Sequence, residues 1–186
     1  MSDPFKTLGV ERRCYFTEEE LKEAYHAQAK ALHPDAVHGD TAEFVHLNTA
    51  YRKLLDPALR LRTLIDLEYP GQNGDTKSLP SRIDLFQTTA RTLEEAKQWI
   101  TKLKEVSSEI VRTSLLAECE EIISEIDSAQ AAVEHWKRGL TKQLKELDVS
   151  RDKKEAISLS AVATDFAYAD RWLKNLREQK FQLSAS

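Results

Sequence analysis

The sequence is poor in the residues that turn and break protein chains. It has only five glycines and five prolines among 186 residues, which is well below their usual share. Sheet proteins depend on such residues at their many turns, so this scarcity disfavours β-structure and excludes collagen-like repeats. Hydrophobic residues make up 41% of the chain, which is enough to build a core and argues against disorder along the whole length. The composition therefore predicts an all-α protein.

Cysteine and long apolar runs are also scarce. Cys14 and Cys119 lie far apart and outside any Cys-x-x-Cys spacing, so neither a disulfide framework nor a zinc knuckle is indicated. No apolar run approaches the ~20 residues of a membrane span. Residues 1–10 lack the basic start and apolar stretch of a secretory signal. We therefore expect a cytoplasmic protein without a membrane partner.

Several kinds of chemistry have little support in the sequence. A formal net charge of -4 disfavours nucleic acid as a partner. A Gly-rich phosphate loop is absent, and neither cysteine has a motif that would orient a histidine toward it. A polar cluster of potential metal ligands lacks a further ligand from a helical core; it comprises His33, Asp35, His38 and Asp40. We therefore predict a protein that is not an enzyme, with no catalytic residues, no metal and no cofactor.

The first long helix is predicted to begin at a capping box. In this motif Thr17 and Glu20 can satisfy each other's backbone N–H groups. The helix ends at His33, because Pro34 disfavours helical geometry in the residue before it. One apolar stripe follows the helix, formed by Leu21, Tyr25, Ala29 and Leu32.

A second helix of similar length opens near residues 40–41 and ends at Asp56-Pro57. Its apolar face consists of Phe44, Leu47, Tyr51, Leu54 and Leu55. With a short polar loop between them, the two helices form an antiparallel hairpin whose tip carries residues 33–35. A short helix over residues 5–8, capped by Asp3-Pro4 and stopped by Gly9, precedes the hairpin.

Residues 70–80 contain two of the five glycines and two of the five prolines, and are predicted to be a linker. Three long amphipathic helices follow. Their stripes comprise Ile83, Phe86, Ala90, Leu93, Ile100 and Leu103; then Leu115, Cys119, Ile122, Ile126, Ala129, Val133, Trp136, Leu140, Leu144 and Leu147; then Leu159, Val162, Phe166, Ala169, Leu173 and Leu176. Polar turns are expected near 105–108 and 150–154, and a break or bend of the middle helix near Thr113. The stripes predict an antiparallel three-helix bundle over residues 81–186, after a first domain over 1–69.

The tripeptide His33-Pro34-Asp35 is a weak signal alone, and the segments on either side of it make it more specific. It follows a Phe5-x-x-Leu8-Gly9-Val10 segment and precedes Asn48-x-Ala50-Tyr51-x-x-Leu54-x-Asp56-Pro57. This arrangement, which covers about residues 3–67, resembles a J domain, the module by which co-chaperones stimulate ATP hydrolysis in DnaK-type chaperones. The resemblance implies a DnaK-type ATPase as partner.

The end of this region resembles one type of J protein. The segment Asp56-Pro-Ala-Leu-Arg60-Leu-Arg-Thr-Leu64 is similar to that of HscB-type co-chaperones of iron-sulfur cluster assembly. In that family a linker and a C-terminal three-helix bundle follow, as they are expected to do here. The resemblance implies the iron-sulfur cluster scaffold protein as the client. A J protein for a different client, and a helical adaptor with a degenerate J domain, are the alternatives. The oligomeric state is not defined.

The expected chaperone site consists of the tripeptide and a basic helix face. Pro34 stiffens the loop, Asp35 can bond a partner cation, and His33 can stack and donate a hydrogen bond. J domains usually carry a basic face on the first hairpin helix, and here that face has only Lys22, His26 and Lys30. Four further cations could contribute instead, or could form a solvated face or local ion pairs: Arg52, Lys53, Arg60 and Arg62.

The expected client site lies on the bundle. In HscB-type proteins an apolar patch of the first and last bundle helices binds the scaffold protein, and the resemblance places Leu85 and Phe86 in it. Tyr168 and Trp172 lie off the main stripe of the last helix, one turn apart, and are the other candidates. The alternative is that all four side chains pack in a wide core or under the J domain.

Overall fold

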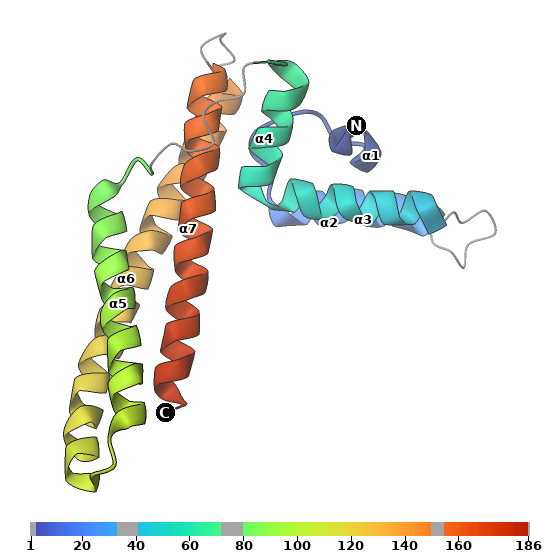
Figure 1. The fold of residues 1–186 in the computed structure, drawn as a ribbon. Coiled ribbons are helices and arrows are strands. Elements are labelled where there is room, and N and C mark those ends of the chain that lie inside the picture. The colour runs from blue at the N-terminus through green and yellow to red at the C-terminus, as the bar shows by residue number, and fades with distance from the viewer. Residues whose placement is uncertain (1–2, 33–40, 72–79, 150–154, 186) are drawn as a thin grey trace. The chain divides into compact units, whose positions relative to one another are not determined.

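The computed structural model describes residues 3–32, 41–71, 80–149 and 155–185, and every regular element in these ranges is an α-helix (Figure 1). The helices are α1 (Pro4–Leu8), α2 (Glu18–Leu32), α3 (Thr41–Leu55), α4 (Pro57–Glu68), α5 (Ile83–Glu105), α6 (Glu109–Val149) and α7 (Glu155–Ser184). They form two compact units. The first comprises Met1–Ser78 with Thr141–Thr164, and the second comprises Leu79–Leu140 with Asp165–Ser186. The predicted all-α fold is confirmed.

Helix α1 is short, and its own neighbours satisfy both of its ends. The Asp3 carboxylate accepts the backbone N–H of Phe5 at 3.0 Å and a guanidinium N–H of Arg12 at 2.6 Å. At the other end Gly9 has φ +70° and donates its N–H to the Lys6 carbonyl at 3.1 Å. A side chain would be strained at this φ, so glycine ends the helix here. The predicted short helix is confirmed.

Helices α2 and α3 form the predicted hairpin, and α3 also packs against α1 and α4 (Figure 1). Helix α2 begins with the predicted capping box. The Glu20 N–H donates to Thr17 Oγ1 at 3.1 Å, and the Thr17 N–H donates to Glu20 Oε2 at 2.7 Å. Tyr25 of α2 donates its hydroxyl hydrogen to Asn48 Oδ1 of α3 at 2.9 Å. The hairpin is therefore joined by a polar bond as well as by its buried leucines.

Helix α4 is an element that the sequence analysis missed. Asp56 accepts the Leu59 N–H at 3.0 Å, and Pro57 occupies the first helical position. Both signals are present in the sequence, where Asp56-Pro57 predicted only the end of the preceding helix. Leu61, Leu64 and Ile65 of α4 are buried in the first unit.

In the second unit, α5 and parts of α6 and α7 lie side by side (Figure 1). Their shared core includes Trp99 of α5, Ile126 of α6 and Leu176 of α7. The expected turn after Glu105 is confirmed, whereas the expected turn over 150–154 lies outside the described residues. The predicted break or bend near Thr113 does not interrupt α6, which continues through this position as one 41-residue helix.

The predicted buried face of α5 is wrong in part. Leu103 is buried, and Leu93 and Ile100 pack against the core, as expected. Ile83 is 51% exposed and Phe86 37% exposed. The residues of α5 that are buried are Leu85, Thr89, Thr92, Ala96, Trp99 and Leu103. This face follows three-four spacing, but two threonines and an alanine interrupt its hydrophobic signal. The stripes predicted for α6 and α7 are largely buried, as expected.

Candidate functional site

The tripeptide His33-Pro34-Asp35 lies outside the described residues. His33 directly follows Leu32, the last residue of α2, and α3 begins at Thr41. The two helices that flank the tripeptide in the chain are therefore defined.

The basic side chains expected on α2 are exposed. Lys22, His26 and Lys30 follow one another at intervals of four residues, which places them on one helix face. The ring of His26 lies 5.5 Å from that of Tyr25, in an edge-on arrangement. Tyr25 also donates a hydrogen bond to Asn48 of α3, so the ring that His26 contacts is held in place by α3. All three side chains of this face are therefore accessible to solvent.

Arg60, one of the further cations considered as partner contacts, is buried instead. Only 3% of it is exposed, and its Nε–H donates to the Cys14 carbonyl at 2.8 Å. A second guanidinium N–H donates to the carbonyl of Leu54 at the end of α3. Burial lowers the pKa of Arg60 to about 10, although the charges of Asp56 and Asp148 among others oppose this effect. Arg60 therefore joins the α1–α2 loop to α3, and the expectation of a surface role is wrong.

The other three cations in this group differ in exposure. Arg52 of α3 and Arg62 of α4 are exposed, and Lys53 of α3 is half-buried.

Sequence reasoning also missed Asp148, near the end of α6. Its Oδ1 accepts the backbone N–H of Cys14 at 2.5 Å, and its Oδ2 accepts that of Tyr15 at 2.9 Å. The three residues belong to the first unit. A local motif could not reveal this contact, because more than 130 residues separate the partners in the chain.

Three of the four expected client residues meet around one tryptophan. The ring of Trp172 on α7 lies 5.7 Å from that of Phe86 on α5 and 5.8 Å from that of Tyr168. Trp136 of α6 stacks on the same ring at 5.5 Å. Trp172 is itself buried, whereas Phe86 is exposed and Tyr168 is partly exposed. The accessible part of this aromatic cluster therefore consists of Phe86 and Tyr168.

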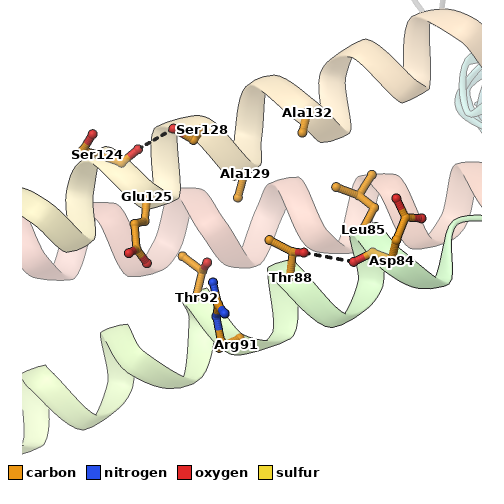
Figure 2. A pocket seen from close by; sticks show the side chains of 10 residues that line it. All are labelled: Asp84, Leu85, Thr88, Arg91, Thr92, Ser124, Glu125, Ser128, Ala129 and Ala132. Atoms are coloured by element: carbon orange, nitrogen blue, oxygen red, sulfur yellow. Dashed lines mark hydrogen bonds between the residues drawn. The ribbon is translucent and has the colours of Figure 1, made fainter.

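Leu85, the fourth expected client residue, lies on another side of α5. It is buried and lines a groove between α5 and α6 with a volume of about 410 Å³ (Figure 2). Small and polar side chains line much of this groove, including Thr88 of α5 and Ser128 and Ala132 of α6. The structure therefore does not bring Leu85 together with Phe86, Tyr168 and Trp172.

Two further properties concern the described residues only. Within these ranges, no three His, Cys, Asp or Glu side chains lie close enough to hold a metal ion. The polar cluster at residues 33–40 considered above falls outside them. None of the described helices is both long enough and apolar enough to cross a membrane.

Comparison with known proteins concerns the N-terminal part of the chain. Residues 3–62 match the DnaJ domain family. DnaJ homolog 1, mitochondrial, from Schizosaccharomyces pombe is 44% identical over 59 residues, which cover 31% of this chain and 11% of that protein. The Chaperone protein DnaJ from Caldicellulosiruptor bescii is 44% identical over 61 residues, which cover 31% of this chain and 15% of that protein.

The chain thus matches less than a sixth of the length of either relative. The matched segment contains the short helix α1 and the hairpin of α2 and α3. The chain carries a J domain at its N-terminus.

Proposed function

We propose that this protein is a co-chaperone whose J domain stimulates ATP hydrolysis by a DnaK-type chaperone. The observation that carries the proposal is the match of residues 3–62 to the DnaJ domain family, with His33-Pro34-Asp35 between the two hairpin helices. The exposed Lys22 and Lys30 of α2 support it, because they offer an acidic chaperone surface charge-assisted contacts.

The steady-state ATPase rate of a DnaK-type chaperone tests this proposal. We expect the wild-type protein to raise the rate and His33→Gln to abolish the increase. His46→Gln is the matched control, since His46 is an exposed histidine on α3 outside the tripeptide. Absence of stimulation by the wild-type protein would instead support a helical adaptor with a degenerate J domain.

We further propose that residues 81–186 form a client-presenting domain of the HscB type, and that its client is the iron-sulfur cluster scaffold protein. The order of parts supports this proposal: a J domain, then a segment rich in Gly and Pro, then three long helices. Phe86 and Tyr168 support it as well, because an exposed and a partly exposed aromatic side chain over a buried tryptophan make a suitable anchor for a partner.

Capture of a purified scaffold protein by the full chain tests the client. Phe86→Ala and Tyr168→Ala are each expected to weaken capture. Phe181→Ala is the matched control, because Phe181 is an aromatic residue of α7 that is 73% exposed and outside the cluster. Unchanged capture by both cluster variants would exclude the patch, and no capture by the wild-type protein would point to a different client.

A further inference from the structure

The loop between α1 and α2 is held by a carboxylate from a distant part of the chain. Two consecutive backbone N–H groups, those of Cys14 and Tyr15, donate to the two oxygens of Asp148 at 2.5 and 2.9 Å. Hydrogen bonds to an ionised acceptor are about twice as strong as neutral ones. One side chain of α6 thus supplies the acceptor for both of these loop amides.

Two further side chains, those of Arg60 and Lys145, contact the same loop. The Cys14 carbonyl accepts the Nε–H of the buried Arg60 at 2.8 Å, so this residue is fixed at both its N–H and its C=O. Lys145, one turn before Asp148 on α6, places its Nζ 4.6 Å from the centre of the Tyr15 ring. The end of α6 therefore contacts the loop through a carboxylate and through a cation.

We call the two hydrogen bonds from the Cys14 and Tyr15 amides to Asp148 the Asp148 clamp. The residues that it holds lie directly before α2 in the chain. Phe16 follows Tyr15, is 7% exposed and lies 6.4 Å from the ring of Phe5 in α1. Thr17 then forms the capping box at which α2 begins. Only Phe16 and Thr17 separate Tyr15 from the first residue of α2, so a shift of the clamped loop would displace the start of that helix.

We propose that Asp148 is a positioning residue for the chaperone-facing helix of the J domain. Its carboxylate fixes the loop before α2, and so fixes where Lys22, His26 and Lys30 stand. This inference rests on the proposed co-chaperone function. Loss of the clamp lets the start of α2 sample other positions, and the apparent affinity for the chaperone falls in proportion to the competent fraction. Once the chaperone is saturated, stimulation is unchanged, because His33-Pro34-Asp35 is intact.

The test compares full-length wild-type protein with Asp148→Asn and Glu146→Gln. Asparagine keeps the shape of the side chain but removes the charge and one acceptor. Glu146 is an exposed carboxylate on the same turn of α6 and is the matched control. Two quantities are measured: hydrogen exchange of the Cys14 and Tyr15 amides by NMR, and chaperone ATPase rate against co-chaperone concentration.

For Asp148→Asn we expect exchange at these two amides to accelerate by about tenfold or more. We expect the half-maximal concentration for ATPase stimulation to rise by about threefold or more, with the maximal rate retained. Glu146→Gln should leave both quantities unchanged, and Asp148→Glu should restore part of each. If Asp148→Asn does not fold, Lys145→Gln serves instead, with a smaller rise of the half-maximal concentration expected.

Unchanged amide exchange in Asp148→Asn would overturn the clamp. Faster exchange with an unaltered stimulation curve would overturn the positioning role and leave Asp148 as a structural residue. A flat curve for the wild-type protein would overturn the proposed function, and the positioning role with it. Failure of the function is thus seen in the wild-type protein, whereas failure of the inference is seen only in the variants.

Discussion

At the scale of single residues, a few charged side chains near α2 serve several partners at once. Glu20 accepts the Thr17 N–H through Oε2 and an Arg13 guanidinium N–H at 2.5 Å through Oε1. The bond from the Thr17 N–H, followed by the bond from Arg13, holds the pKa of Glu20 below its ordinary value of 4.5. A carboxyl group with a lowered pKa stabilises the fold above its unfolded pKa, and this stabilisation is lost as pH falls through the lowered value.

Replacement of Glu20 by glutamine is therefore expected to have a pH-dependent effect. At neutral pH the melting temperature should fall by about 2–4 °C, since one capping interaction is lost. The gap to the wild-type protein should shrink as pH falls below about 4.5, because the wild-type carboxylate is then protonated too. Melting curves followed by circular dichroism between pH 7 and pH 3 test this, with the exposed Glu23→Gln as control. A gap that stays constant with pH would contradict the assignment.

Arg60 is the second such side chain, and its loss should be costly. Arg60→Ala leaves the carbonyls of Cys14 and Leu54 without their guanidinium donors. We expect the free energy of unfolding to fall by about 2–4 kcal/mol. Arg62→Ala, on the exposed face of the same helix, should change it by less than about 0.5 kcal/mol. Urea unfolding measures both, and equal effects of the two variants would contradict the buried role of Arg60.

At the scale of elements, local signals predicted the ends of α1, the start of α2 and the buried faces of α6 and α7, but they did not predict α4. The ends of α1 and α2 follow from Asp3, Gly9 and the capping box, which act within a few residues of the chain. The buried face of α5 followed only in part, because Thr89 and Thr92 each have a polar group but pack inside. The hydrogen bonds from Cys14 and Tyr15 to Asp148 could not be predicted from a local pattern either, because more than 130 residues separate these partners in the chain.

The buried face of α5 leads to a prediction at Thr89. This residue has no exposed surface, and its hydroxyl has no hydrogen-bond partner among the residues that the structure describes. Thr89→Val replaces the hydroxyl with a methyl group of similar size, so we expect the free energy of unfolding to rise by about 1 kcal/mol. Thr88→Val is the control, because Thr88 is exposed and donates to the Asp84 carbonyl. A loss of stability in Thr89→Val on urea unfolding would show that this hydroxyl has a partner.

At the scale of the whole molecule, α6 and α7 each contribute to both compact units. The first unit takes residues 141–164 from them, and the second takes the remainder. Since α6 is continuous across residue 140, unfolding of either unit ends in the middle of a hydrogen-bonded helix. We therefore expect the two units to unfold together rather than one after the other.

The three tryptophans make this coupling measurable. Trp99, Trp136 and Trp172 all belong to the second unit, so their fluorescence follows that unit, while Arg60 belongs to the first. We expect Arg60→Ala to move the fluorescence transition in urea to lower concentration, together with the transition seen by circular dichroism. A fluorescence transition that stays in place, while circular dichroism shows an earlier phase, would mean that the units unfold independently.

Because Asp148 contacts Cys14 and Tyr15, residues 1–70 cannot be transferred to another protein with all their contacts intact. A chimera that receives only residues 1–70 would gain a loop with two amide groups deprived of their carboxylate. An engineer who transplants this module into another host must bring the end of α6 as well, or recruit an acidic residue from the recipient. Gene recombination that separates these segments would remove the same two hydrogen bonds.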